Sequence, residues 1–93
     1  MIYSKEQISR IKELAGYLTP ISDIAVLMDL DADELRLDLQ NWKSDVAKAY
    51  FKGKAESQLA LRQQELELAR VGSPLAVQMA TTYIMNMDTD EDL

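Results

Sequence analysis

The 93-residue sequence contains no cysteine and no histidine. Without cysteine the chain forms no disulfide, and nothing points to an oxidising compartment. The usual zinc sites need cysteine or histidine ligands, so structural zinc is excluded, as are Ser-His-Asp and Cys-His triads. An enzyme would have to work with carboxylates, lysine or tyrosine, and no pair of these stands out from ordinary surface charge. We therefore expect a protein that is not an enzyme and that uses no cofactor.

Glycine and proline are scarce as well, with three and two copies. Their scarcity favours long helices over a sheet with many turns. Long apolar runs are also missing. No run approaches the roughly 20 residues of a membrane span, and the first residues lack the apolar block of a signal peptide. We expect a cytoplasmic protein with no membrane partner.

Acidic residues outnumber basic ones, which gives a formal net charge of −6. Residues 88–93 hold four of the sixteen acids and leave twelve acidic against ten basic residues in the rest of the chain. With nearly equal numbers of acidic and basic residues, residues 1–87 are poorly suited to non-specific DNA binding, which depends on neutralising phosphates. The acidic end has too few apolar residues to pack, so we expect it to be disordered.

Capping signals mark where helices begin. Ser4 and Gln7 have the spacing of a capping box, and Asp31 and Glu34 repeat it. Apolar residues at helical spacing follow each signal. One example is the face that Leu35, Leu39 and Trp42 share.

Other signals complete the division into helices. Thr19-Pro20 and Ser73-Pro74 each pair a capping hydroxyl with proline at the first helical position. Asn41 or Ser44 can cap the longest helix, and Gly72 suits the residue that follows its end. The predicted helices span 5–18, 20–28, 32–41, 45–70 and 74–87.

The predicted fold is all-α. It has an N-terminal three-helix unit of the helix-turn-helix kind over 1–42, a long antiparallel helical hairpin over 43–87 and an acidic tail over 88–93. Gly53 is the weak point of the long helix, costing about 1 kcal/mol relative to alanine. We expect its missing side chain to let another helix approach closely.

The segment 19–39 has the short helix, tight turn and second short helix of a helix-turn-helix. Ala25 fits the small position where the two helices cross, and Leu30 fits the apolar position after the turn. Asp29 takes the place usually held by glycine, and aspartate tolerates the left-handed conformation better than most residues. The helix-turn-helix pattern therefore indicates DNA as a candidate partner.

The charge of the second short helix speaks against groove insertion. Helices that read DNA present basic or amide side chains to base edges. This one carries three acids, Asp33, Glu34 and Asp38, beside Arg36. Both interpretations stay open: a three-helix fold without DNA contact, or contact through Arg36 and nearby lysines.

Aspartates at positions 29, 31 and 33 imitate the start of a calcium loop. An EF-hand loop needs glycine at its sixth position and glutamate at its twelfth, and here these are Glu34 and Gln40. Helix capping explains Asp31 and Glu34 better, so we expect no metal site.

The only concentration of basic residues is at the start of the long helix, and it is either a solvated face or a contact for phosphates or an acidic partner. The acidic tail is likewise either a solubilising end or a segment that docks on a basic partner. The candidate nucleic-acid-binding residues are Lys12, Arg36, Lys43, Lys48 and Lys52.

The last two predicted helices carry more apolar residues than a two-helix hairpin can bury, because each helix hides one stripe. The surplus packs either against the first 42 residues or against other copies, and we expect a homo-oligomer. The candidate interface residues are Phe51, Ala55, Leu59, Leu66, Met79, Tyr83 and Ile84.

Residues 20–87 resemble the small terminase subunits and related helix-turn-helix proteins of tailed phages. The resemblance rests on the pattern A-Y-x-x-G-K-A-E from Ala49, then L-R at Leu61, then A-x-x-G-S-P-x-A from Ala69. It implies a ring-forming DNA-recognition subunit that passes DNA to a large ATPase-nuclease subunit. It also implies that the hairpin assembles, that the tail faces the large subunit, and that the site of action is the host cytoplasm if a phage encodes the chain.

Two other functions stay open. The first is a transcription regulator of the helix-turn-helix type, which would be a dimer that binds a palindrome tightly. The second is an interaction module with no nucleic-acid role. None of the three takes a small-molecule substrate.

Overall fold

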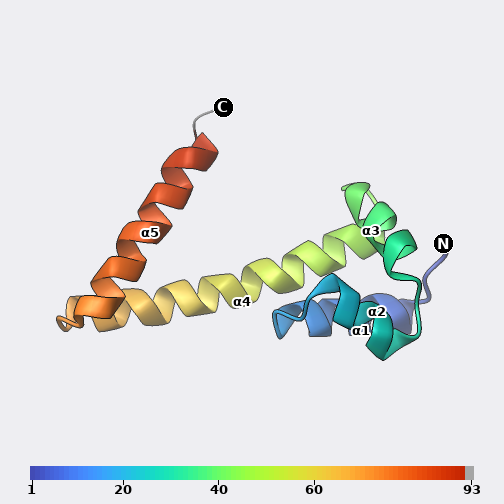
Figure 1. Cartoon of the computed structure of the whole chain (residues 1–93), viewed down its shortest axis with the longest axis horizontal. Coiled ribbons are helices and arrows are strands. Elements are labelled where there is room, and N and C mark those ends of the chain that lie inside the picture. The colour runs from blue at the N-terminus through green and yellow to red at the C-terminus, as the bar shows by residue number, and fades with distance from the viewer. Residues whose placement is uncertain (92–93) are drawn as a thin grey trace. The chain divides into compact units, whose positions relative to one another are not determined.

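The computed structural model describes residues 1–91. They form five helices and no strand, which confirms the all-α prediction (Figure 1). By its internal contacts the chain divides into two units, Met1–Ser57 and Gln58–Leu93. The helices are α1 (Lys5–Gly16), α2 (Ile21–Met28), α3 (Ala32–Gln40), α4 (Asp45–Arg70) and α5 (Pro74–Glu91).

The first unit contains the hydrophobic core. This core is formed by the apolar faces of α1, α2 and α3 together with the first turns of α4. The unit extends through Ser57, whereas the sequence predicted its end at residue 42. The reason is that Val46, Ala47 and Tyr50 of α4 are buried and complete the core. The remaining core residues are Ile11, Leu14, Ala15, Ile24, Ala25, Leu35 and Leu39.

Most of the predicted caps form. The Ser4 hydroxyl accepts a hydrogen bond from the Gln7 amide at 3.1 Å, and the Gln7 side chain accepts one from the Ser4 amide at 2.8 Å. Asp31 accepts from the Glu34 amide at 3.0 Å. Ser44, not Asn41, caps α4 by accepting from Ala47 at 3.2 Å. These bonds satisfy amides that have no partner within the first helical turn.

The predicted cap at Thr19-Pro20 is wrong. Helix α2 begins at Ile21, so Pro20 takes the N-cap position with no side-chain cap, and α1 already ends at Gly16. The prediction for Ser73-Pro74 is confirmed, since α5 begins at Pro74 and the Ser73 hydroxyl accepts from the Ala76 amide at 3.4 Å.

Three helices end in the same way, on a left-handed residue. Leu18 has φ 58°, Asp29 has φ 55° and Gly72 has φ 93°. In each case the next amide donates to the carbonyl five residues back, at 2.8–3.1 Å, as in a Schellman motif. The conformation is easy for glycine and tolerable for aspartate, whereas it strains the β-carbon of Leu18.

Helix α1 crosses the start of α4 at Gly53, as expected for a glycine that lets a helix approach. A β-carbon at Gly53 would collide with the carbonyl oxygen of Lys12 and lie 3.2 Å from its carbonyl carbon. The Ser57 hydroxyl then donates to the Gly16 carbonyl, one of the unpaired carbonyls at the end of α1. Backbone contact therefore joins these two helices.

The second unit contains the rest of α4 and α5. Its less exposed positions recur every three or four residues and define one stripe on each helix, here called the seam: Gln58, Arg62, Glu65 and Ala69 of α4 and Ala76, Ala80 and Tyr83 of α5. The Arg62 guanidinium lies 5.3 Å from the centre of the Tyr83 ring. Only Ala76 is fully buried in the described part of this unit. From the turn at Gly72 the two segments diverge as a V (Figure 1).

The end of the chain also differs from the prediction. Helix α5 continues through Glu91, so residues 88–91 are helical where the sequence predicted disorder. The backbone hydrogen bonds of α5 simply continue, and the Thr89 hydroxyl donates to the Met85 carbonyl at 2.9 Å. Residues 92 and 93 of the predicted tail lie outside the described residues.

Candidate functional site

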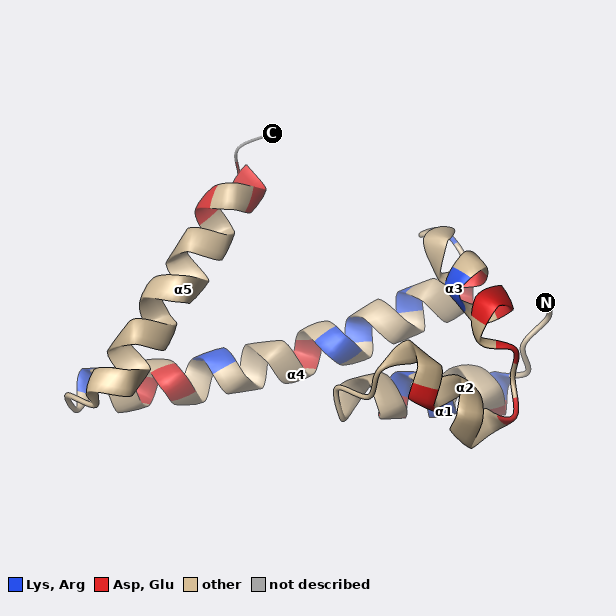
Figure 2. Ribbon diagram, viewed as in Figure 1, with Lys and Arg blue, Asp and Glu red and all other residues tan. Residues whose placement is uncertain are grey.

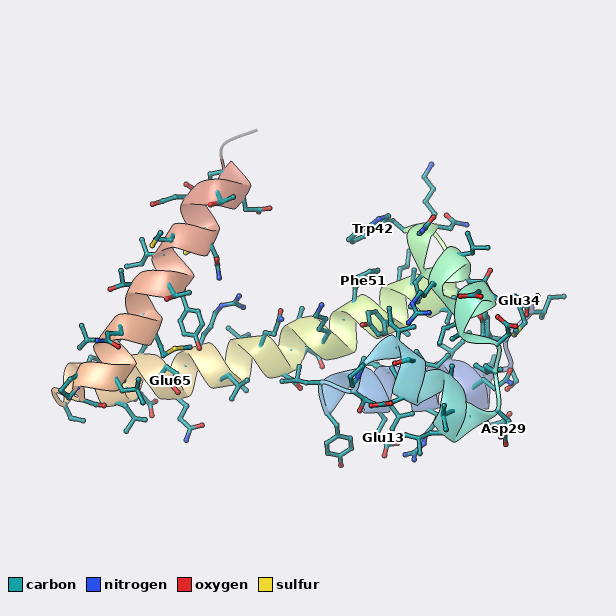
Figure 3. All side chains as sticks on the ribbon, viewed as in Figure 1. Glu13, Asp29, Glu34, Trp42, Phe51 and Glu65 are labelled. Carbon is teal, nitrogen blue, oxygen red and sulfur yellow. The ribbon has the colours of Figure 1, made fainter. Side chains whose placement is uncertain are left out.

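A tight turn at Asp29 joins α2 and α3. Asp29 ends α2 with φ 55° and ψ 43°, and the Leu30 amide donates to the Ala25 carbonyl at 2.8 Å. Ala25 is buried at the crossing, and Leu30 packs against the core. Asp29 and Glu34 both lie at the outer side of this turn (Figure 3). The fold therefore presents α3 as an outer helix, and its exposed surface decides what it can bind.

That exposed surface remains acidic. Glu34 and Asp33 are exposed, and Arg36 is paired with Asp33 at 3.7 Å. An exposed pair of this kind is worth little and leaves the arginine free to exchange partners. Helix α3 therefore offers one weakly held cation beside two acids.

Asp38, the third acid of α3, is engaged within the chain. It accepts a hydrogen bond from the Tyr3 hydroxyl at 2.6 Å, and the N-terminal ammonium lies 3.7 Å away. This contact pins the N-terminal segment to α3. Neither the contact nor the engagement of Asp38 was apparent from the sequence, because the two residues are 35 positions apart.

The Tyr3–Asp38 pair has the residue types of a general acid–base pair, but its surroundings favour the neutral phenol. Burial raises the pKa of the Tyr3 phenol well above its usual range, and the hydrogen bond to Asp38 and the charges of Asp38 and Glu34 add to that effect. A phenol with a raised pKa stays protonated near neutral pH and is a poor general base. The pair is therefore suited to holding the N-terminal segment in place.

The five predicted nucleic-acid-binding residues are not brought to one spot. Lys48 and Lys52 are exposed one turn apart on α4, and Lys43 is exposed in the turn before it. Lys12 instead lines a hollow together with two acids, Glu13 and Glu56. Basic residues follow the first half of α4, whereas acidic residues gather at the start of α3 and the end of α5 (Figure 2).

An aromatic pair stands beside these lysines. The ring of Trp42 is stacked on Phe51, with centroids 4.4 Å apart and planes within 5°. Phe51 in turn meets Tyr50 edge to face at 5.0 Å, and Tyr50 belongs to the core. The sequence wrongly put Trp42 on the apolar face of α3. That helix ends at Gln40, and 68% of the Trp42 surface is exposed (Figure 3).

The predicted interface residues fall into two groups. Phe51 is half-buried in the first unit under Trp42, and Tyr83 is half-buried in the second unit under Arg62. The others are exposed side chains: Ala55, Leu59, Leu66, Met79 and Ile84.

Exposed leucines of α4 form two rows on the second unit. Leu59 and Leu66 each follow a seam residue in the sequence, and Leu61 and Leu68 each precede one. An α-helix turns by about 100° per residue, so the row of Leu59 and Leu66 and the row of Leu61 and Leu68 lie on opposite sides of the seam. All four leucines are at least 42% exposed.

Helix α5 repeats this arrangement. Val77 and Ile84 follow seam residues, and Leu75 and Met79 precede them. Apolar residues therefore flank the seam on both sides. The sequence did not predict which stripe packs within the chain, since the seam uses small and polar residues of α4 in place of its leucines.

Within residues 1–91, no three carboxylates gather in a way that could hold a metal ion. In the same range, no helix is both long and apolar enough to cross a membrane.

Compared with known proteins, the chain matches no protein-family model, no curated protein sequence and no solved structure.

Proposed function

We propose that the protein is a non-enzymatic, self-assembling adaptor of the DNA-packaging type, similar in role to a phage small terminase subunit. In this proposal the second unit joins copies of the chain and the first unit contacts DNA. The observation that carries it is the pair of leucine rows on α4, exposed on both flanks of the seam.

The energetics favour assembly. Burying a leucine contributes roughly 1.5–3 kcal/mol, and monomeric proteins rarely expose contiguous apolar patches this rich in large side chains. Eleven large apolar side chains between Leu59 and Met87 are more than a third exposed. Because the rows flank the seam on both sides, each pair of helices offers apolar surface to two neighbours. This supports a ring or bundle of more than two copies over a simple dimer.

The first unit supports the DNA part of the proposal less strongly. The helix-turn-helix geometry and the exposed Lys43, Lys48 and Lys52 favour contact, and the acids of α3 oppose reading of a groove. We therefore expect weak, salt-sensitive binding to the phosphate backbone. By the resemblance, the acidic end of α5 would meet a larger packaging subunit in the cytoplasm of the host cell.

Size-exclusion chromatography with light scattering tests the assembly. We expect a species larger than a dimer at tens of micromolar protein, and a strict monomer would contradict the proposal. DNA binding is tested separately, by titrating duplex DNA at about 50 mM and about 200 mM salt. Weak binding that is lost with salt supports the adaptor.

Selection from random duplex DNA separates the adaptor from a regulator. A tightly bound palindrome together with a dimer would replace the proposal with a transcription regulator. Assembly with no DNA binding even at low salt would leave an interaction module without a nucleic-acid role.

A further inference from the structure

We infer that the stacked pair Trp42–Phe51, together with Lys43, Lys48 and Lys52, is a binding site for single-stranded nucleic acid. The site lies entirely within the first unit. It goes beyond the proposed function, which concerns assembly and contact with duplex DNA. An unpaired base would stack on the outer face of Trp42, and the lysines would meet the adjoining phosphates.

The aromatic pair is held in place before any ligand arrives. One face of Trp42 is covered by Phe51, and Phe51 is braced edge to face by Tyr50 of the core. Since 68% of the Trp42 surface is still exposed, its outer face is open. A rigid, half-covered indole is the kind of surface on which single-stranded nucleic acid stacks its bases, whatever their sequence.

Hydrogen bonds fix the turn that carries Trp42. The Ser44 hydroxyl donates to the Asn41 carbonyl at 2.8 Å, and the Asn41 side chain accepts from the Lys43 amide at 3.2 Å. Trp42 lies between these residues in the sequence, so its backbone has little freedom. Fixing a side chain in advance lowers the entropy that a ligand loses on binding.

Within the part of the chain that the structure describes, no ion pair engages the three lysines. Lys43 is next to Trp42 in the sequence, and Lys48 lies one turn before Lys52 on the exposed side of α4. Lys48 is also three residues from Phe51, which makes the two neighbours on the helix surface. Among residues 1–91 no ion pair within 4.0 Å involves these lysines, although Asp45 and Glu56 are on the same helix.

Two lysines one turn apart repel each other and destabilise a helix slightly. The placement of Lys48 and Lys52 therefore does not stabilise the fold. An anionic ligand would relieve the repulsion. A flat aromatic face beside phosphate-binding cations matches a single strand, whose bases expose their faces. Duplex DNA hides those faces in its stack, so it can use the lysines but not Trp42.

Fluorescence gives a direct test, because Trp42 is the only tryptophan of the chain. The full chain is titrated with an oligothymidylate of about twenty nucleotides. We expect tryptophan emission to be quenched by the single strand and unchanged by a duplex of the same length. With three lysines engaged, log affinity should fall against log salt with a slope of about −2.

Variants are measured by the anisotropy of a labelled oligothymidylate. Trp42→Leu should weaken binding about tenfold or more, and Trp42→Phe should retain most of it. Tyr17→Leu is the matched control, since Tyr17 is a 75% exposed aromatic of the same unit and lies outside the stack. Lys48→Gln combined with Lys52→Gln should reduce the salt slope to about −0.7.

Equal binding by Trp42→Leu and the wild type would overturn the inference, as would the absence of quenching at low salt. Emission that changes with protein concentration alone would assign the aromatic pair to contact between copies and would also overturn it. Light scattering on the same variants keeps the two proposals distinct. Assembly without single-strand binding rejects only this site, and a monomer that binds single strands rejects only the assembly.

Discussion

Gly53 of α4 and Lys12 of α1 meet backbone to backbone, so closely that a β-carbon on Gly53 would collide with the Lys12 carbonyl oxygen. Gly16 lies at the same crossing with more room, since a β-carbon there would be 3.7 Å from the Ser57 hydroxyl oxygen. Gly16 should therefore tolerate alanine, whereas Gly53 should not.

We predict that Gly53→Ala destabilises the protein even though alanine is the better helix former. Overpacking costs about 1–3 kcal/mol, and the helix-propensity gain offsets at most about 1 kcal/mol. Gly16→Ala should be neutral or stabilising by less than about 1 kcal/mol. Chemical denaturation followed by circular dichroism measures both variants, and equal stability of the two would contradict the crossing.

Tyr3 should make stability fall at high pH. Its pKa is raised on folding, so the neutral phenol stabilises the fold below the ordinary tyrosine pKa of about 10, and the contribution is lost as the pH rises above that value. Tyr3→Phe should lose about 1 kcal/mol at neutral pH, because it removes the hydrogen bond that the Tyr3 hydroxyl donates to Asp38. The free energy of unfolding of the variant should then decline less than that of the wild type between pH 9 and pH 11. Parallel curves would exclude this role for Tyr3.

Leu18 is strained, and relieving the strain should stabilise the first unit. The left-handed conformation costs leucine about 1 kcal/mol or more and costs asparagine less. We expect Leu18→Asn to raise the free energy of unfolding by about 0.5–1 kcal/mol. The control is Leu27→Asn, a similarly exposed leucine within α2, where asparagine lowers helix propensity and should destabilise. Thermal unfolding compares the pair, and a destabilised Leu18→Asn would argue against strain at this position.

The leucine rows of α4 should be interchangeable targets for breaking the assembly. Leu59→Lys with Leu66→Lys charges one flank of the seam, and Leu61→Lys with Leu68→Lys charges the other. Either double variant should reduce the mass measured by light scattering, because each lysine would have to be buried unpaired at an apolar contact.

The matched control for this experiment is Gln63→Lys with Gln64→Lys, which adds the same charge to the same segment outside both rows. It should assemble like the wild type. If the control dissociates as readily as the leucine variants, general charge repulsion and not the apolar rows governs the association.

Local patterns in the sequence determined the helical class, the number of helices and most of their starts. Ser4, Ser44 and Ser73 cap helices as expected, and Gly72 ends one. Such signals act within about five residues, so they can be recognised without knowing the fold. The same locality explains why Asp29 was recognised as the left-handed residue of the turn.

Only the tertiary structure decided which surfaces meet. It placed small and polar residues in the seam of the second unit, left the leucines outside it and set Trp42 on Phe51. It also engaged Asp38 with Tyr3 and placed Lys12 in one hollow with Glu13 and Glu56. These outcomes depend on the shapes and crossings of helices distant in the sequence, and helical periodicity ranks apolar faces without saying which of them finds a partner.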